Sequence, residues 1–219
     1  MKEYELKSTT KITVSEDGTR TYSYSKKLED ISGVEGIFIL LYPTRDITNY
    51  HVVDSTSMHL MNHMNDLGLN SFTIVNLFST VTKSRLSTCG LSIDQENLAY
   101  IKEEIFSKVS KDTKVIVAWG NSHMTSAAVN HSKELILSLY EEVCPGQKLY
   151  QLTCSGLEKD NMGVHPLYLG IRHKNATWNL SVYPHQKVLK ELAKNNSSTA
   201  NPSEQKRTKS KKSKSQTEE

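Results

Sequence analysis

Long apolar runs and metal-type cysteine spacings are both missing from this sequence of 219 residues. Residues 1–5 lack the apolar stretch of a signal peptide, and no run is long enough to span a bilayer. We therefore expect a cytoplasmic protein without a membrane partner. Cys89, Cys144 and Cys154 are odd in number and show no metal spacing, which favours reduced thiols over a disulfide framework.

Signatures of several enzyme classes are absent as well. No glycine-rich phosphate loop and no Cys-His nucleophilic pair stands out, which disfavours kinases, dinucleotide enzymes and cysteine proteases. His59 and His63 are four residues apart on an expected helix, which is the spacing of two zinc ligands. However, Leu60 stands where the zinc peptidase motif has its catalytic Glu, and no third ligand is placed nearby. We expect no metal and no cofactor.

Positive charge is concentrated at the end of the chain. Residues 195–219 contain six Lys and Arg residues against three Glu residues, which accounts for the whole net charge of +3. Because this segment is nearly free of apolar residues, we expect one domain over 1–194 and a disordered basic tail over 195–219. A solubilising tail and a tail that holds DNA phosphates explain the composition equally well. The expected DNA contacts of the tail are Lys206, Arg207, Lys209, Lys211 and Lys212.

Alternating strand and helix patterns predict an α/β fold. A turn signal at Asp17-Gly18 predicts a β-hairpin over 4–14 and 19–27. The expected buried strands span 37–41, 72–78, 114–119 and 148–153, and the expected helices span 55–67, 92–109, 122–142 and 184–194. This alternation predicts a three-layer α/β/α sandwich with a central, mostly parallel four-stranded sheet and an N-terminal hairpin.

Four segments each join an apolar run to polar or small residues. They are LLYPT at 40–44, VNLF at 75–78, VAWG at 117–120 and HPLYL at 165–169. Open α/β sheets bind their ligands at the carboxyl ends of the strands. We therefore expect the four segments to surround one pocket.

The order and the residue sequences of these segments resemble the motifs of the uracil-DNA glycosylase superfamily. In that superfamily a first strand ends in a Pro-containing motif that positions water, and a second strand ends in an Asn that reads the base. A third strand ends in Trp-Gly, and a His-Pro loop presses on the flipped nucleotide. The chain resembles more closely a bacterial family of unknown function with the pattern Asn-Pro-Ser-Thr-Ala-Asp, Asn-Leu-Phe, Ala-Trp-Gly and His-Pro-Leu-Tyr-Leu. Together the resemblances span about residues 20–170.

The resemblance implies roles for three of the residues. His165 would donate a hydrogen bond to the base or to a flanking phosphate, and Asn76 would read the Watson–Crick edge of a flipped base. Phe78 would stack on that base. Each residue also has a structural alternative: a loop histidine bonded to backbone, a turn asparagine and a core phenylalanine.

The first motif departs from both families at Tyr42. The glycosylases have Asn or Asp before the proline, and tyrosine cannot act as a carboxylate. Water positioning would then come from Asp46, which matches the Asp that closes the unknown family's pattern, or from Asp54. Asp54 directly precedes Ser55-Thr56, so a helix N-cap is an equally good interpretation of this residue.

The remaining residues of this motif complete the expected site. We expect Tyr42, Pro43 and Thr44 to contact the substrate. Arg45 suits phosphate oxygens because its guanidinium group binds them in a bidentate manner, although an exposed structural arginine is an equally good interpretation.

The resemblance implies a DNA glycosylase that excises a flipped, modified base, and we expect it to act as a monomer on double-stranded DNA. Base excision passes through a cationic sugar and an anionic leaving base, which a carboxylate and a hydrogen-bond donor can stabilise. The departure at Tyr42 favours a hypermodified or glucosylated cytosine of phage DNA over uracil, and abasic sites would then serve antiviral defence. The alternatives are a noncatalytic module that binds a nucleotide or modified base, and a nucleoside hydrolase.

Overall fold

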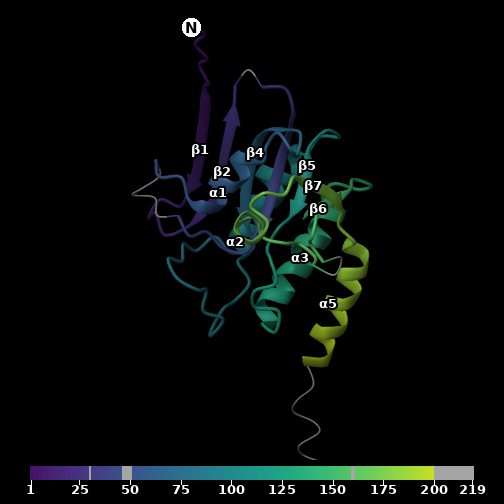
Figure 1. Ribbon diagram of the computed structural model, residues 1–219. Helices are drawn as coiled ribbons and strands as arrows, with labels where there is room; N and C mark the ends of the chain where they lie inside the picture. Colours follow the sequence, from purple (N-terminus) through teal and green to yellow (C-terminus); the bar gives the residue numbers. More distant parts are fainter. Residues whose placement is uncertain (30, 46–50, 159–160, 200–219) are drawn as a thin grey trace, which may run out of the picture.

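One mixed β-sheet organises the chain (Figure 1). The computed structural model describes residues 1–29, 31–45, 51–158 and 161–199. The seven strands in these ranges are β1 (Ser8–Val14), β2 (Thr21–Leu28), β3 (Val34–Leu40), β4 (Leu69–Asn76), β5 (Lys114–Val117), β6 (Leu149–Cys154) and β7 (Trp178–Val182). Their order in the sheet is β1-β2-β4-β3-β5-β6-β7. The β4–β3, β3–β5 and β5–β6 pairs are parallel, and the β1–β2, β2–β4 and β6–β7 pairs are antiparallel.

The prediction of a four-stranded, mostly parallel sheet is therefore wrong. The N-terminal hairpin does not precede the sheet but joins it, because β2 pairs with β4 and places Tyr24 opposite Ile74. Half of the strand pairs in the described residues are antiparallel, and β7 was not predicted at all. β7 is a short edge strand in which Trp178 is buried while its last residue, Val182, is exposed. Such a strand lacks the continuous apolar run that marks the inner strands.

Helices cover both faces of the sheet. They are α1 (Ser55–Asn62), α2 (Gln95–Tyr100), the π-helical η2 (Ile101–Ile105), the 3₁₀-helical η3 (Phe106–Lys108), α3 (Ala127–Val143), α4 (Pro166–Arg172) and α5 (His185–Thr199). Because side chains alternate along a strand, Ile37 and Ile39 of β3 face α3 and α5, whereas Phe38 and Leu40 face α1 and α4. Figure 1 shows α3 and α5 side by side. No helix in the described part of the chain is both long enough and apolar enough to cross a bilayer.

Several helix boundaries differ from the expected ones for local reasons. The helix expected from residue 92 begins after Asp94, whose carboxylate accepts a hydrogen bond from the Asn97 backbone. The helix expected from residue 122 begins after Ser126, since His123 adopts a φ of 59° that an α-helix cannot include. Helix α4 was not predicted, and α5 ends at Thr199 instead of 194.

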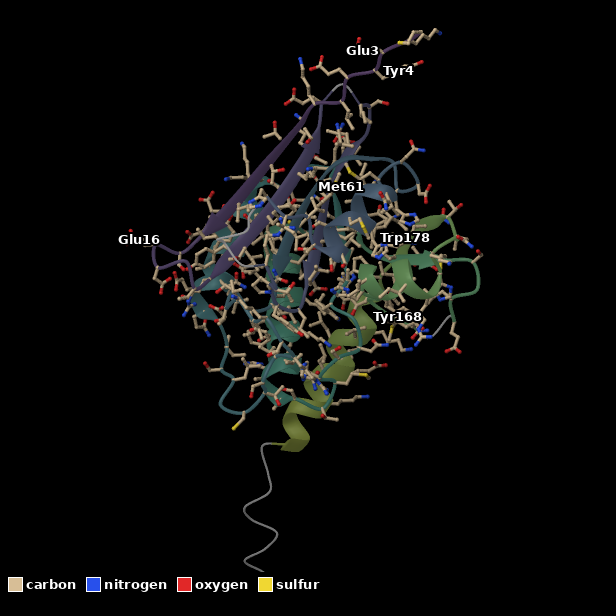
Figure 2. All side chains as sticks on the ribbon, turned by 60° about the vertical axis from the view of Figure 1, so that its left-hand side comes forward. Glu3, Tyr4, Glu16, Met61, Tyr168 and Trp178 are labelled. Carbon is tan, nitrogen blue, oxygen red and sulfur yellow. The ribbon has the colours of Figure 1, made fainter. Side chains whose placement is uncertain are left out.

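The two histidines with zinc spacing serve the packing of α1 against the sheet and α4. His63 stacks on the Trp178 ring with centroids 4.0 Å apart, and its Nδ1 lies 2.8 Å from a carboxylate oxygen of Asp66. The same oxygen accepts a hydrogen bond from the Trp178 backbone. The His59 ring lies directly against the backbone of Gly170, where a Cβ would collide with it. This side of the molecule carries Met61, Trp178 and Tyr168 (Figure 2).

Candidate functional site

A pocket lies where the carboxyl ends of β3, β4 and β5 meet the amino end of α4. Its volume is about 540 Å³, which is within the range of roughly 300–1,000 Å³ that is typical of small-molecule sites. The lining residues are Thr21, Tyr24, Leu40 to Arg45, Asp54, Thr56, Ile74, Asn76, Trp119 to Ser122, Asn161, Val164, His165, Leu167 and Tyr168. All four of the sequence segments singled out above contribute to this wall.

Asn76 is the last residue of β4 and lies at the bottom of the pocket. Its exposed fraction is 3%, and its side-chain oxygen Oδ1 is buried without a hydrogen-bond partner among the described residues. Buried amide groups in proteins are nearly always hydrogen bonded, because an unpaired one costs about 1–3 kcal/mol. An amide left open in a pocket wall is therefore available to a ligand.

A network behind the strand end holds the backbone of Asn76 in place. The Asn97 side chain donates a 2.7 Å hydrogen bond to the Asn76 carbonyl oxygen. Asp94, the N-cap of α2, accepts hydrogen bonds from the Ser79 backbone and hydroxyl at 2.8 and 2.7 Å and pairs with Arg20 at 3.1 Å. These contacts join the end of β4 to α2 and β2, so the position of Asn76 does not depend on its own side chain.

His165 is the N-cap of α4, and Pro166 occupies the first helical position, where proline is favoured. The Leu167 backbone N–H donates to His165 Nδ1 at 3.2 Å. Because Nδ1 accepts this bond, a neutral ring carries its proton on Nε2. Burial lowers the pKa of His165 from 6.5 to about 4, and the nearby Asp54 opposes the shift. At neutral pH, His165 therefore presents a neutral N–H donor in the pocket wall.

Asp54 caps α1 and also lines the pocket, and its role in positioning water stays a prediction. One carboxylate oxygen accepts from the Ser57 backbone at 2.7 Å, and the other pairs with Arg45 at 2.9 Å. Arg45 also donates to the Ser57 hydroxyl at 3.1 Å and lies 3.9 Å from the Tyr24 ring centroid. Its side chain is only 8% exposed. Arg45 is therefore a largely buried arginine that pairs with Asp54 and lines the pocket, and its contact with phosphate stays a prediction.

The other predicted residues fall into three groups. Tyr42, Pro43 and Thr44 line the pocket as expected. Phe78 does not, because it is buried in the core between the sheet and helices α3 and α5. Asp46 and the tail residues Lys206, Arg207, Lys209, Lys211 and Lys212 lie outside the described residues.

The Trp119-Gly120 segment touches the loop that holds His165. Gly120 has a φ of 72°, and a Cβ at this position would lie 3.3 Å from the His165 Cβ. Its N–H donates to the Gly163 carbonyl at 2.8 Å. The left-handed backbone and the close approach both favour glycine here. Gly120 thus sets the distance between the end of β5 and His165.

Several lining residues, Tyr24 and Asn161 among them, lie outside the four predicted segments. Tyr24 belongs to the hairpin, which was not expected to reach the pocket, and Asn161 lies in an irregular segment without a local signal. Tyr168 belongs to the segment expected at the pocket, but it lies on α4, a helix whose start the Pro at the first helical position could have indicated.

The fold and pocket define an α/β domain with a ligand site at the carboxyl edge of its parallel strands. Sequence comparison adds that the family profile DUF1643, described as a protein of unknown function, matches residues 22–167. The chain belongs to this family. The match begins in β2 and ends in α4, so it covers every segment that lines the pocket except Thr21 and Tyr168. Neither the curated proteins nor the solved structures contain a significant match.

Proposed function

We propose that this protein is a DNA glycosylase that excises a flipped, modified base. The observation that carries the proposal is the buried, unpaired side-chain oxygen of Asn76 in the pocket wall. A nucleobase supplies N–H groups that such an oxygen accepts, and a base pulled out of the duplex exposes these groups. Asn76 would thus read the edge of the base.

His165 supports the chemistry of the leaving base. Negative charge collects on a base as its bond to the sugar breaks. A neutral imidazole whose proton sits on Nε2 can donate to that charge, and the lowered pKa keeps the ring neutral over the physiological range. The other ring nitrogen, Nδ1, accepts a hydrogen bond from the Leu167 backbone, so the Nε2 donor is oriented before the substrate binds.

In this proposal, the carboxylates of Asp54 and Asp46 stabilise the cationic sugar. Asp54 lines the pocket, and its charge is felt at the His165 ring. The ion pair with Arg45 reduces the negative potential that Asp54 exerts on a sugar. Asp46 lies one residue beyond Arg45, in the segment that follows the pocket-lining residues 40–45.

The size of the pocket favours an enlarged base over uracil. Uracil has eight non-hydrogen atoms, and if each takes no more than the share of a water molecule in the liquid, about 30 Å³, the ring fills less than half of the pocket. A hydroxymethylated or glucosylated cytosine would use the remaining space. We propose double-stranded DNA as the partner of a cytoplasmic, monomeric enzyme, with defence against phages of modified DNA as its role.

The test incubates the protein with duplexes that contain uracil, hydroxymethylcytosine or glucosylated hydroxymethylcytosine, followed by alkaline cleavage and mass analysis of the released base. We expect a free modified base and an abasic strand. His165→Asn should lower the rate by about 100- to 1,000-fold, as the loss of one donor to a developing anion does in other enzymes. Asparagine is itself a good N-cap, so α4 should persist. His131→Gln on the exposed face of α3 is the matched control.

A second function has one observation in its favour. Both oxygens of Asp54 are already engaged, which suits a module that binds a modified base without cutting it. Intact strands with every duplex, together with measurable binding of the modified DNA, would establish this second function and refute excision. Intact strands without binding by the folded protein would refute both.

A further inference from the structure

Lys133 is a buried lysine without a counter-charge. It lies on α3, its exposed fraction is 7%, and its Nζ is 5.5 Å from the centroid of the Trp119 ring. Among the described residues, no carboxylate or hydrogen-bond acceptor pairs with this ammonium group, whereas buried lysines are normally paired. Burial alone lowers the pKa of Lys133 to about 8.

His123 lies within electrostatic range of two cations, Lys133 and Arg85. His123 has an Nε2 that is buried without a partner, and its φ of 59° is a conformation that non-glycine residues rarely adopt. Burial and then the charges of Arg85 and Lys133 lower the pKa of His123, so both cations lie within electrostatic range of the imidazole. Positive groups that repel each other in a partly buried position indicate a missing anion.

We propose that Lys133, His123 and Arg85 bind a phosphate group of the nucleotide whose base occupies the pocket. The cluster directly adjoins the pocket wall, because Trp119 lines the pocket and touches Lys133, and His123 follows the lining residue Ser122. This inference rests on the proposed nucleotide ligand but not on cleavage of the base. A phosphate offers several acceptor oxygens and full negative charge, which matches one ammonium, one guanidinium and one imidazole donor.

The test measures binding of inorganic phosphate, dCMP and deoxycytidine by titration calorimetry to the full chain. We expect dCMP to bind more tightly than deoxycytidine and Lys133→Met to lower the dCMP affinity by roughly ten- to a hundredfold, the value of a hydrogen bond to a charged group. Lys133→Arg should keep most of the affinity. Lys114→Met is the matched control, since the Lys114 ammonium also lies over a ring, 5.2 Å from the Tyr150 centroid, at the opposite end of β5.

Each outcome decides the proposal. Equal affinity for dCMP and deoxycytidine, no binding of any phosphate, or an equal loss in Lys114→Met and Lys133→Met would overturn it. Arg85→Met, on an exposed residue, provides a second variant if Lys133→Met does not fold, and an unchanged dCMP affinity in that variant would count against the cluster. A parallel loss of duplex binding in Lys133→Met assigns the phosphate to the DNA strand, and an unchanged duplex affinity assigns it to a free nucleotide. Absence of base excision with phosphate binding intact would refute the glycosylase and leave this site standing.

Discussion

Two polar side chains near the carboxyl end of β4 differ in whether their oxygens have hydrogen-bond partners within the protein. Asp94 is held by Ser79, Asn97 and Arg20, so both of its oxygens have partners within the protein. Asn76, whose backbone carbonyl accepts a hydrogen bond from Asn97, has a side-chain oxygen without any partner in the described residues. Both groups are desolvated at the same strand end.

This difference in hydrogen bonding suggests that Asp94 stabilises the folded protein, whereas Asn76 serves ligand binding. A satisfied carboxylate such as Asp94 contributes to the folded state, because its removal leaves several buried donors unpaired. An unsatisfied amide such as Asn76 costs free energy in the folded state, and its oxygen becomes useful only when a ligand supplies the missing donor. Four predictions test this distinction, from the largest expected effect to the smallest.

Asp94→Ala should cost the most stability. The substitution removes the acceptor of the Ser79 and Asn97 backbone N–H groups and the partner of Arg20, so we expect the free energy of unfolding to fall by about 3 kcal/mol. Urea denaturation measures the change. Asp112→Ala, on an exposed residue, is the control and should stay within about 0.5 kcal/mol of the wild type. Equal stability of the two variants would contradict the role assigned to Asp94.

The pocket side should respond to acid through His165. Its pKa is about 4 in the folded protein and near 6.5 when unfolded, so the unfolded state binds more protons between these values. The contribution of His165 is therefore complete above about pH 6.5 and is lost as the pH falls toward 4, by roughly 3 kcal/mol. His165→Asn should flatten the urea-derived stability curve in this window, and His131→Gln should leave it as in the wild type. An unchanged slope in His165→Asn would contradict the burial argument.

Asn76→Ala should separate binding from stability. We expect the affinity for the modified base to fall by roughly tenfold to a hundredfold, because a ligand donor loses its acceptor, while the free energy of unfolding changes by less than about 1 kcal/mol. Asn70→Ala, near the other end of β4, is the control and should bind normally. If Asn76→Ala bound the ligand as well as the wild type, the amide would have no recognition role.

Gly120→Ala should have the smallest effect of the four substitutions. Gly146→Ala is its control, because it separates the cost of the backbone conformation from the contact with His165. Both glycines have a positive φ, so each substitution should cost about 1–2 kcal/mol of stability in thermal or urea unfolding. A Cβ at Gly146 meets nothing within 4 Å, whereas one at Gly120 presses on His165. Only Gly120→Ala should therefore impair base binding or excision. Equal activity of the two variants would show that this contact does not position His165.

Local sequence signals predicted much of the framework and some of the site. The apolar runs at 37–41 and 72–78 overlap β3 and β4, and Asp17-Gly18 lies between β1 and β2 as its turn signal indicated. The convergence of Tyr42 and Asn76 in one pocket also followed from the rule for strand ends, whereas His165 reaches the same pocket as the N-cap of α4. The partners of β2 and β7 could not be predicted, because strand pairing is decided between segments far apart in the chain.

The alternative roles of Asp54 and Phe78 could not be decided from the sequence either, because they depend on contacts with other parts of the fold. Asp54 was equally good as a cap and as a catalytic acid, and only the approach of Arg45 and Ser57 shows that both of its oxygens are engaged. Phe78 was a candidate stacking ring, although an apolar residue at a strand end is more often core, and the packing of α3 and α5 buries it in the core. Nothing in the pattern around Lys133 indicated burial without a partner.

By itself, then, the sequence determined where the inner apolar strands and the hairpin turn occur, because these depend on neighbouring residues and their periodicity. The tertiary structure alone decided which buried polar groups are satisfied. Hydrogen bonds and ion pairs such as those of Asp94 join residues separated by up to 74 positions in the chain, and the gaps they leave at Asn76 and Lys133 exist only once the chain is folded.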